Sequence, residues 1–249
     1  MAAAPPAYGE IPPGFERFLD ERMCLFFGPH RIFTSVFALD LDPDEVGDAL
    51  EDVRAKARER GVHEVKWWVG PDARPPDLVQ RLNAAGVAAS DEPRVAAMAL
   101  RNEPQFPDTP VIVQRVGTIE ELGEAEEVGL EAFQNSEEER RAFRENIEDS
   151  WGLQGRWIQS FAAYLDGRMV GTARSAYLEG AVLLIGGAVL PEARGRGAYR
   201  ALVRARWDDA VERGSPALIV HAGSMSRPIL ERLGFETICE LDVLEDTIQ

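Results

Sequence analysis

The segment Ala188–Val203, which reads AVLPEARGRGAYRALV, constrains the fold of this chain more than any other stretch. An apolar run ends at Pro191, two arginines and two glycines follow, and a helix-like pattern begins at Tyr199. Glycines bring a backbone close to a ligand, and the first amides of a helix point outward without partners. The segment therefore predicts a strand, an anion-binding turn and a helix, with a diphosphate as the natural ligand. Taken alone, it also fits a plain strand-to-helix turn with exposed arginines.

The flanking sequence predicts an α/β arrangement around this segment. Before it, a strand at 111–116 and two helices at 118–133 and 136–151 lead into three strands between 158 and 189, of which the first two are joined by an Asp-Gly turn. After it, we expect a helix at 199–214, a strand at 216–222, a helix at 227–234 that starts with proline, and a final strand at 235–244.

A proline-rich linker and a weak internal repeat predict two related halves. The linker Arg101–Val111 carries three prolines within seven residues. A shift of 153 positions superimposes Ala57–Pro75 on Ala210–Pro228 with seven identities in nineteen positions. The same shift places the acidic LDPDE of Leu41–Glu45 on RGRGA of Arg194–Ala198. We therefore expect the first half to reject a phosphate.

The overall charge and the cysteine content exclude several classes of protein. Forty-three acidic residues against 27 basic ones give a net charge of −16, which argues against nucleic-acid binding. Cys24 and Cys239 have no cysteine or histidine at metal-ligand spacing, so neither a disulfide framework nor a metal site is expected. The Pro-rich N-terminus, residues 1–17, predicts a loose arm without a secretory signal, and no apolar run suits a membrane span. A cytoplasmic location is the expectation.

The order of elements and the motif residues from Val111 to Gln249 resemble the GCN5-related N-acetyltransferase (GNAT) superfamily. The family pattern is Val-x-Pro at the end of a strand, then Gln/Arg-x-x-Gly-x-Gly/Ala, then a helix. The positions that correspond to it are Val189, Pro191, Arg194, Gly197 and Tyr199. The resemblance implies acetyl-CoA as co-substrate, with its pantetheine arm on the strand edge at Gly187 and Val189. It further implies that the diphosphate lies on the amides of Arg194, Gly195, Arg196, Gly197, Ala198 and Tyr199.

Three positions depart from the family pattern. Tyr199 stands where a small residue is expected in the loop. In the second signature, LERLGF, Leu230 takes the place of a tyrosine that in the family commonly protonates the departing thiolate. Gly223 takes the place of an asparagine that is often found seven residues earlier. These departures leave the general acid of this chain open.

Two residues are candidate catalytic groups. His221 ends the strand PALIVHA, and a neutral imidazole there could take a proton from an amine. A partly buried histidine satisfied by its neighbours is the alternative. Ser226 could replace the missing tyrosine through a water, or it could cap the following helix. In the first two helices of the C-terminal half, an acceptor amine could be bound by Glu124, Glu126, Glu127, Trp151 and Trp157, although a solvated acidic face over core tryptophans is the favoured explanation.

These observations predict a GNAT fold, a mixed central sheet flanked by helices, with two GNAT-like halves in tandem. Residues 1–106 would form a degenerate half without CoA binding, and residues 111–249 an acetyltransferase domain. The predicted activity is acetyl transfer from acetyl-CoA to a primary amine of a small molecule or a protein, without nucleic acid or membrane as partner, in a monomer or a homodimer. A non-catalytic acyl-CoA-binding or ligand-sensing module is the alternative.

Overall fold

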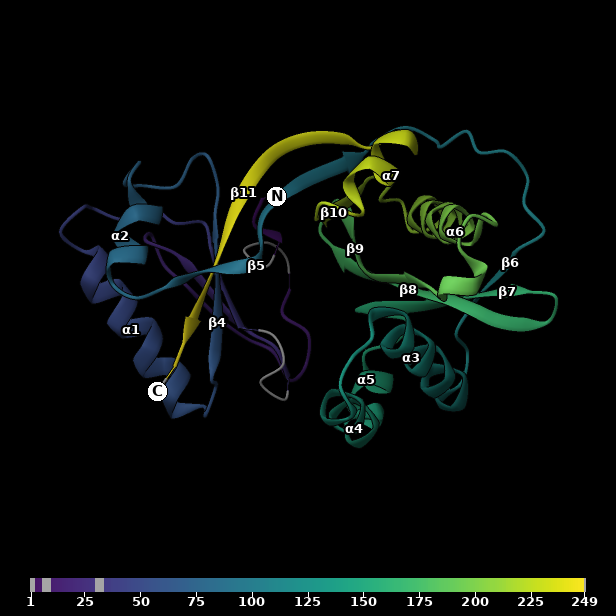
Figure 1. Cartoon of the computed structure of the whole chain (residues 1–249), viewed down its shortest axis with the longest axis horizontal. Coiled ribbons are helices and arrows are strands. Elements are labelled where there is room, and N and C mark those ends of the chain that lie inside the picture. The colour runs from purple at the N-terminus through teal and green to yellow at the C-terminus, as the bar shows by residue number, and fades with distance from the viewer. Residues whose placement is uncertain (1–2, 6–9, 30–33, 249) are drawn as a thin grey trace. The chain divides into compact units, whose positions relative to one another are not determined.

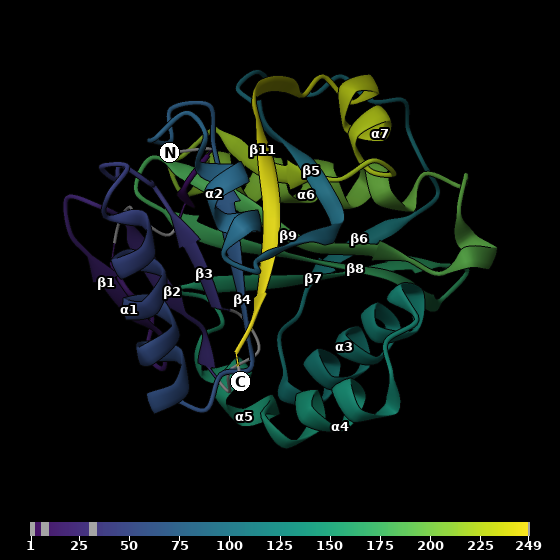
Figure 2. The ribbon, with the colours of Figure 1, turned by 60° about the vertical axis from the view of Figure 1, so that its left-hand side comes forward.

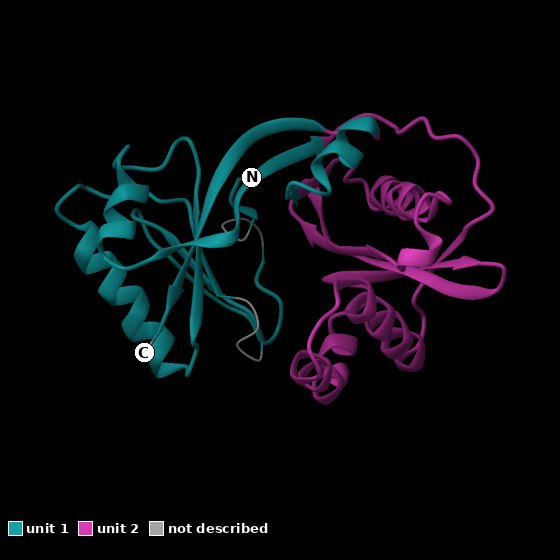
Figure 3. Cartoon of the chain, in the orientation of Figure 1, with its two compact units in different colours: residues 1–99, 221–232, 236–249 teal, residues 100–220, 233–235 magenta. Residues whose placement is uncertain are grey.

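The structure is a computed structural model, and it describes residues 3–5, 10–29 and 34–248. The chain forms two compact units (Figure 3). The first unit contains residues 1–99, 221–232 and 236–249, and the second contains residues 100–220 and 233–235. Part of the predicted N-terminal arm, residues 1–2 and 6–9, lies outside the described residues.

The first unit is built on a mixed sheet with the strand order β1–β2–β3–β4–β11–β5. β3 and β4 are parallel, whereas β11 is antiparallel to both β4 and β5. Two helices, α1 and α2, cover one face of this sheet (Figure 1), and fully buried Trp67 and Leu50 belong to the core of this unit. The elements are β1 (Glu16–Leu19), β2 (Cys24–Phe27), β3 (Thr34–Phe37), α1 (Val46–Glu59), β4 (Glu64–Val69), α2 (Leu78–Ala84), β5 (Ala88–Leu100), α7 (Arg227–Arg232) and β11 (Glu236–Thr247).

The second unit has a sheet with the strand order β10–β9–β8–β7–β6. β6 to β9 are antiparallel neighbours, and β10 is parallel to β9. α6 covers one face of the sheet, and α3, α4 and α5 gather on the other (Figures 1 and 2). The elements are β6 (Ile112–Arg115), α3 (Ile119–Phe133), α4 (Glu137–Glu145), α5 (Ile147–Gly152), β7 (Ile158–Leu165), β8 (Arg168–Leu178), β9 (Ala181–Val189), α6 (Ala198–Glu212) and β10 (Leu218–Ala222). The predicted mixed sheet flanked by helices is confirmed.

Local sequence signals explain the boundaries of these elements. Asp166 and Gly167 both have positive φ, 53° and 80°, which suits the two-residue turn predicted between β7 and β8. The Thr118 side chain accepts a hydrogen bond from the amide of Glu121 and starts α3 where the sequence predicts it. Ser136 starts α4 with a capping box.

The prediction of one helix over 136–151 is wrong, because the helix is interrupted at Asn146. Asn146 has φ −111° and ψ 15°, outside the helical region, and separates α4 from α5. Its side-chain amide donates a 2.7 Å hydrogen bond to the carbonyl of Ala142. Asparagine competes for backbone groups in this way, and it therefore favours helix ends over helix interiors.

The compact units do not coincide with a sequential division at residues 106 and 111. β11 forms ladders with β4 and β5, so the residues 236–249 complete the sheet of the first unit. The backbone hydrogen bonds of these two ladders explain why a segment from the second half of the sequence lies in the first unit. The assignment of the two sequence halves as a degenerate and a CoA-binding domain stays a prediction.

Both units contain a parallel strand pair joined by a helix. In the first unit the order is β3–α1–β4, and in the second it is β9–α6–β10. Helix α1 at 46–59 and helix α6 at 198–212 are aligned within one residue by the shift of 153 positions found in the sequence. The internal repeat thus agrees with the observed elements. In the described part of the chain, no helix is long and apolar enough to cross a bilayer.

A substitution of Asp246 tests how much the contact between β11 and α1 contributes to stability. This carboxylate is 1% exposed and accepts two hydrogen bonds from Arg54 of α1, at 2.9 Å to Nε and 2.8 Å to Nη2. Asp246→Ala leaves the guanidinium without its partner, so we expect the free energy of unfolding to fall by about 2–4 kcal/mol in a urea titration. Glu240→Ala, which removes an exposed partner of Arg227 from the same strand, is the control and should cost under about 1 kcal/mol. Equal losses in both variants would contradict a special role for the buried pair.

Candidate functional site

Strand β9 is paired unequally on its two sides. β8 pairs with it from Ala181 to Val189, whereas β10 pairs with it only at Val182 and Leu183. Residues 184–189 therefore form an open edge, which has no ladder with β10 within the described residues. Free N–H and C=O groups along such an edge can pair with an extended ligand.

A bulge interrupts β9 in the middle of the open edge. The register with β8 shifts between the pairs Thr172–Ala188 and Arg174–Ile185, so that Gly186 and Gly187 both lie opposite one residue of β8. Gly186 has φ 58°, and a Cβ atom there would lie 3.0 Å from Nη2 of Arg174. Bulges of this kind turn backbone groups out of the ladder, and glycine is needed where φ is positive and space is short.

The loop between β9 and α6 presents a row of backbone donors. A 3-10 turn over Pro191–Ala193 leads into the loop, and Gly195 and Gly197 have φ 77° and 92°. Gly197 is the N-cap of α6 and provides no capping side chain. In the described part of the chain, the amides of residues 195–200 donate no hydrogen bond to the protein. Such a run of free amides at a helix N-terminus suits an anion.

Two arginines flank this loop and are exposed. The Arg194 Nε donates a 3.3 Å hydrogen bond to the carbonyl of Val189, and Arg196 lies 3.4 Å from the carboxylate of Asp166. Both side chains of the Arg196–Asp166 pair are more than half exposed, so this contact is weak and can be exchanged for a ligand. The predicted loop residues are therefore brought together, with the charged groups and the free amides at the same helix end.

The ring of Tyr199 and the guanidinium of Arg206 meet at the bulge. A Cβ atom at Gly187 would lie 3.2 Å from Cε2 of Tyr199 and 3.6 Å from Nη2 of Arg206. Tyr199 was predicted as a site residue from the sequence, and Arg206 was not. The seven-residue spacing between them, two turns on the same helix face, was the signal that could have identified the pair.

The two candidate catalytic residues, His221 and Ser226, belong to the first unit, whereas the loop belongs to the second. The His221 imidazole stacks on Trp68 with ring centroids 4.9 Å apart, and Phe37 lies 6.4 Å away. The Ser226 hydroxyl donates a 3.4 Å hydrogen bond to the carbonyl of Gly223, and the residue directly precedes α7. Aromatic packing and the helix start thus account for both positions, and their catalytic roles stay predictions.

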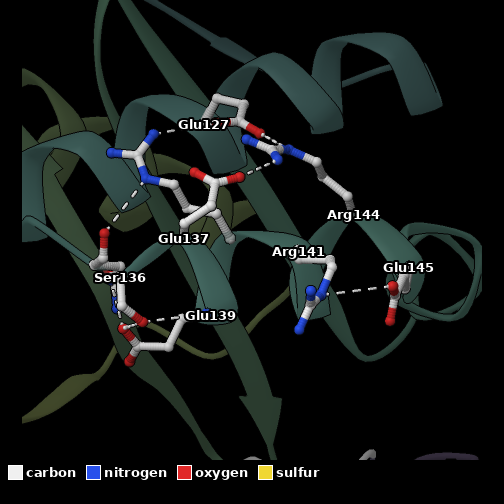
Figure 4. A network of polar contacts seen from close by, with 9 residues as sticks. Glu127, Ser136, Glu137, Glu139, Arg141, Arg144 and Glu145 are labelled. Atoms are coloured by element: carbon white, nitrogen blue, oxygen red, sulfur yellow. Dashed lines mark hydrogen bonds and ion pairs between the residues drawn. The ribbon is translucent and has the colours of Figure 1, made fainter.

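The acidic residues proposed for acceptor binding are partly used within the protein. Glu127 accepts a 2.6 Å hydrogen bond from Arg144, which also contacts Glu137 (Figure 4). This hydrogen bond lowers the pKa of Glu127. Glu126 pairs with Arg174 at 3.4 Å, and Glu124 is exposed.

The two tryptophans proposed for acceptor binding also have partners inside the protein. Trp151 packs against the core of α3, and the guanidinium of Arg156 lies over the ring of Trp157, 4.8 Å from its centroid. Packing accounts for the position of Trp151, and Arg156 covers one face of the Trp157 ring.

Comparison with known proteins identifies the second half of the chain. Residues 120–235 match the model of the acetyltransferase (GNAT) family. This segment is a GNAT domain. The match includes the open edge of β9, the loop and α6, so the features described above lie in the part of the chain that carries the family signal. The comparison with curated proteins found no match.

Solved structures show that the GNAT fold extends over most of the chain. A GCN5-related N-acetyltransferase from Kribbella flavida has a TM-score of 0.71 and 19% identity, over 93% of this chain and 89% of that one. A tandem GNAT protein from the clavulanic acid biosynthesis pathway has a TM-score of 0.60 and 17% identity, over 96% and 85%. A functionally unknown conserved protein from Staphylococcus epidermidis has a TM-score of 0.69 and 12% identity, over 93% of each chain. The GNAT fold predicted from the sequence is confirmed.

The residues of the GNAT domain offer hydrogen-bond donors and a positive charge that suit coenzyme A. The free amides of 195–200 suit a diphosphate, and the open edge of β9 suits the two amide groups of a pantetheine arm. A buried guanidinium group with an unpaired Nη2 adds a complementary positive charge beside the open edge. These groups would supply binding and electrostatics, while the coenzyme would supply the activated acyl group.

The loop conformation can be tested at Gly197. Its φ is 92°, and a Cβ atom there would lie 2.6 Å from Oγ1 of Thr109, so Gly197→Ala must distort the loop. We expect the dissociation constant for CoA to rise at least about tenfold in calorimetry. Gly214→Ala is the matched control, because Gly214 has φ 74° but no heavy atom within 4 Å of a Cβ. If Gly197→Ala bound CoA with unchanged affinity, the loop would not be part of the CoA site.

Proposed function

We propose that the chain is an N-acetyltransferase that moves an acetyl group from acetyl-CoA to a primary amine. The observation that carries the proposal is the open edge of β9, which runs into a loop with six free amides at the start of α6. The GNAT family and fold are those of acyltransferases, and this combination is the part of the fold that an acyl-CoA would use. The acceptor would be the amine of a small molecule or a protein.

In this proposal each part of the site has one task. The loop amides and the flanking arginines Arg194 and Arg196 hold the diphosphate, and the backbone at Gly187 and Val189 holds the pantetheine arm. The bulge turns amides toward the reacting carbonyl, where donors fixed in advance stabilise the negative oxygen of the transition state. The reaction also needs a base, because an ordinary amine with a pKa of about 10 is mostly protonated at neutral pH.

His221 is the proposed base, and Ser226 is the proposed donor of a proton through water. His221 lies near the end of β10, the neighbour of β9 in the sheet, and an imidazole can accept a proton near neutral pH. Its contact with Trp68 holds the ring in one orientation. Ser226 would act only through its hydroxyl, which donates to the carbonyl of Gly223.

The N-terminal sequence half would not bind CoA. β3 pairs with β4 at Ser35 and Val36, and Val36 corresponds to Val189 under the 153-residue shift, so the described end of this strand is paired where β9 is open. The carboxylate of Glu45 accepts a 3.1 Å hydrogen bond from the amide of Asp42 in the acidic loop. The charge of this carboxylate would repel a phosphate from the loop.

A non-catalytic acyl-CoA sensor is the second candidate. Leu230 is fully buried and takes the position of the tyrosine that the family commonly uses as an acid. This substitution favours a protein that binds the coenzyme without transferring its acyl group. The two candidates differ in turnover and share the binding site.

Release of free CoA separates the two candidates. We expect the full chain to release thiol from acetyl-CoA in the presence of at least one member of a panel of polyamines, aminoglycosides and lysine peptides, as followed by a chromogenic thiol reagent. Reactions without amine, which measure simple hydrolysis, are the control. Binding of CoA in calorimetry with no thiol release above that control would favour the sensor.

His221→Ala tests the proposed base. If His221 takes the proton, kcat should fall by about 10²-fold or more while the dissociation constant of CoA stays within threefold, because the loop amides are untouched. Ser226→Ala should leave the dissociation constant unchanged as well and should lower kcat only if its hydroxyl acts. A drop in melting temperature with unchanged kcat would show that stacking on Trp68 and Phe37 is the whole role of His221.

A further inference from the structure

Arg206 of α6 is a buried cation whose hydrogen bonds are incomplete. Its side chain is 1% exposed, and Nε donates a 3.1 Å hydrogen bond to the carbonyl of Leu202 on the same helix. Nη2 is buried and has no hydrogen-bond partner in the structure. A buried donor without a partner costs free energy that a bound ligand can restore.

The guanidinium is also without a counter-ion. Within residues 3–5, 10–29 and 34–248, no ion pair joins Arg206 to a carboxylate, although most other arginines of the chain have one. Burial lowers the pKa of Arg206 to about 10, and the neighbouring Tyr199 opposes this change. The group therefore stays charged at neutral pH, and its charge is available to a negative group that arises nearby.

The guanidinium of Arg206 lies next to the bulge in β9. Nη2 of Arg206 and the ring of Tyr199 both lie within 4 Å of a Cβ built on Gly187. Tyr199 is half-buried and lies in the first turn of α6, directly after the loop. Gly187 itself lies on the open edge. The phenol ring and the buried cation thus meet at Gly187, a residue of the edge along which the proposed pantetheine arm runs.

We propose that Tyr199 donates its hydroxyl proton to the sulfur of the coenzyme as it leaves beside Gly187, and that Arg206 stabilises the negative charge left on the tyrosine oxygen. Tyr199 is then a catalytic residue, and Arg206 is a positioning residue that acts through it. The inference rests on the proposed transferase function and deepens it, because it replaces Ser226 with Tyr199 as the donor of this proton. It also assigns a role to the position where this chain departs from the small residue of its family.

The step balances in atoms and electrons. When the tetrahedral adduct of amine and thioester collapses, the carbon–sulfur bond breaks, its electron pair goes to sulfur, and the Tyr199 proton forms the S–H bond. The amide nitrogen loses its extra proton to the base or to water. Solvent water then returns a proton to the Tyr199 oxygen. A thiol with a pKa of about 8.5 leaves more readily as the thiol than as a thiolate in a site with little water.

Tyr199→Phe removes the hydroxyl and keeps the ring. We expect kcat for acetyl transfer to fall by about 10²-fold, because a general acid contributes 10²–10⁴-fold. The dissociation constant of CoA, measured by calorimetry, should stay within threefold, since the loop amides are unchanged. Tyr164→Phe on β7, a part-buried tyrosine away from Gly187, is the matched control and should leave kcat unchanged.

Arg206→Met and Arg206→Lys test the charge. Arg206→Met should lower kcat as much as Tyr199→Phe and raise the melting temperature by about 3 °C, because it removes an unpaired buried charge. Arg206→Lys should recover most of kcat. Arg204→Met, which removes an exposed arginine of the same helix paired with Asp208, should change neither quantity by much. The double variant Tyr199→Phe with Arg206→Met should be no slower than either single one.

The outcomes distinguish this inference from the proposed function. If the wild-type chain turned over an amine and Tyr199→Phe kept kcat within threefold, the inference alone would be overturned. A lower melting temperature in Arg206→Met, or a weaker affinity for CoA in Tyr199→Phe, would show a structural or a binding role instead. If the wild-type chain bound CoA and released no thiol with any amine, the proposed function would fail, and the inference with it.

Discussion

A strand that is paired on one side must satisfy its remaining amides and carbonyls elsewhere, and six residues of β9 are under this constraint. The rest of the GNAT domain depends on it. β8 holds β9 along its length, so the strand stays in place although β10 leaves it after Leu183. The bulge at Gly186 and Gly187 interrupts the ladder with β8, so backbone groups there are left without a ladder partner. Because these groups are backbone atoms, the site can tolerate side-chain variation that would disable a site built from a catalytic triad.

The arginines of the domain differ in their partners. Several are in exposed ion pairs that contribute little, as around Glu127 and Arg144, while Arg115 and Arg213 pair with the buried carboxylate of Asp209. Arg206 is different, because it is buried without a carboxylate. In this strongly acidic chain, a buried cation without an ion pair among the described residues retains a positive field beside Gly187. The field would act on a charge that forms during the reaction, without competing with the loop amides for the diphosphate.

Much of the fold and part of the site could be predicted from local sequence. The Asp166–Gly167 turn, the cap at Thr118 and the glycines of the loop are decided by neighbouring residues, and the structure agrees with each. At Asn146 the local pattern predicted a continuous helix, but the helix ends where the side chain of this residue donates a hydrogen bond to the backbone. The membership of β11 in the first unit and the isolation of Arg206 depend on contacts between distant segments. No pattern in a single sequence reports those contacts.

The pairing of β11 has a consequence for the way the chain is made. β4 and β5 are synthesised early, but the strand that lies between them begins at Glu236, 136 positions after Leu100. On the ribosome, the edges of β4 and β5 therefore stay exposed while the whole second unit is translated. Contacts of such long sequence separation form slowly, and unpaired strand edges invite aggregation. Chaperones that cover strand edges, or slow translation after Leu100, would matter more for the first unit than for the second.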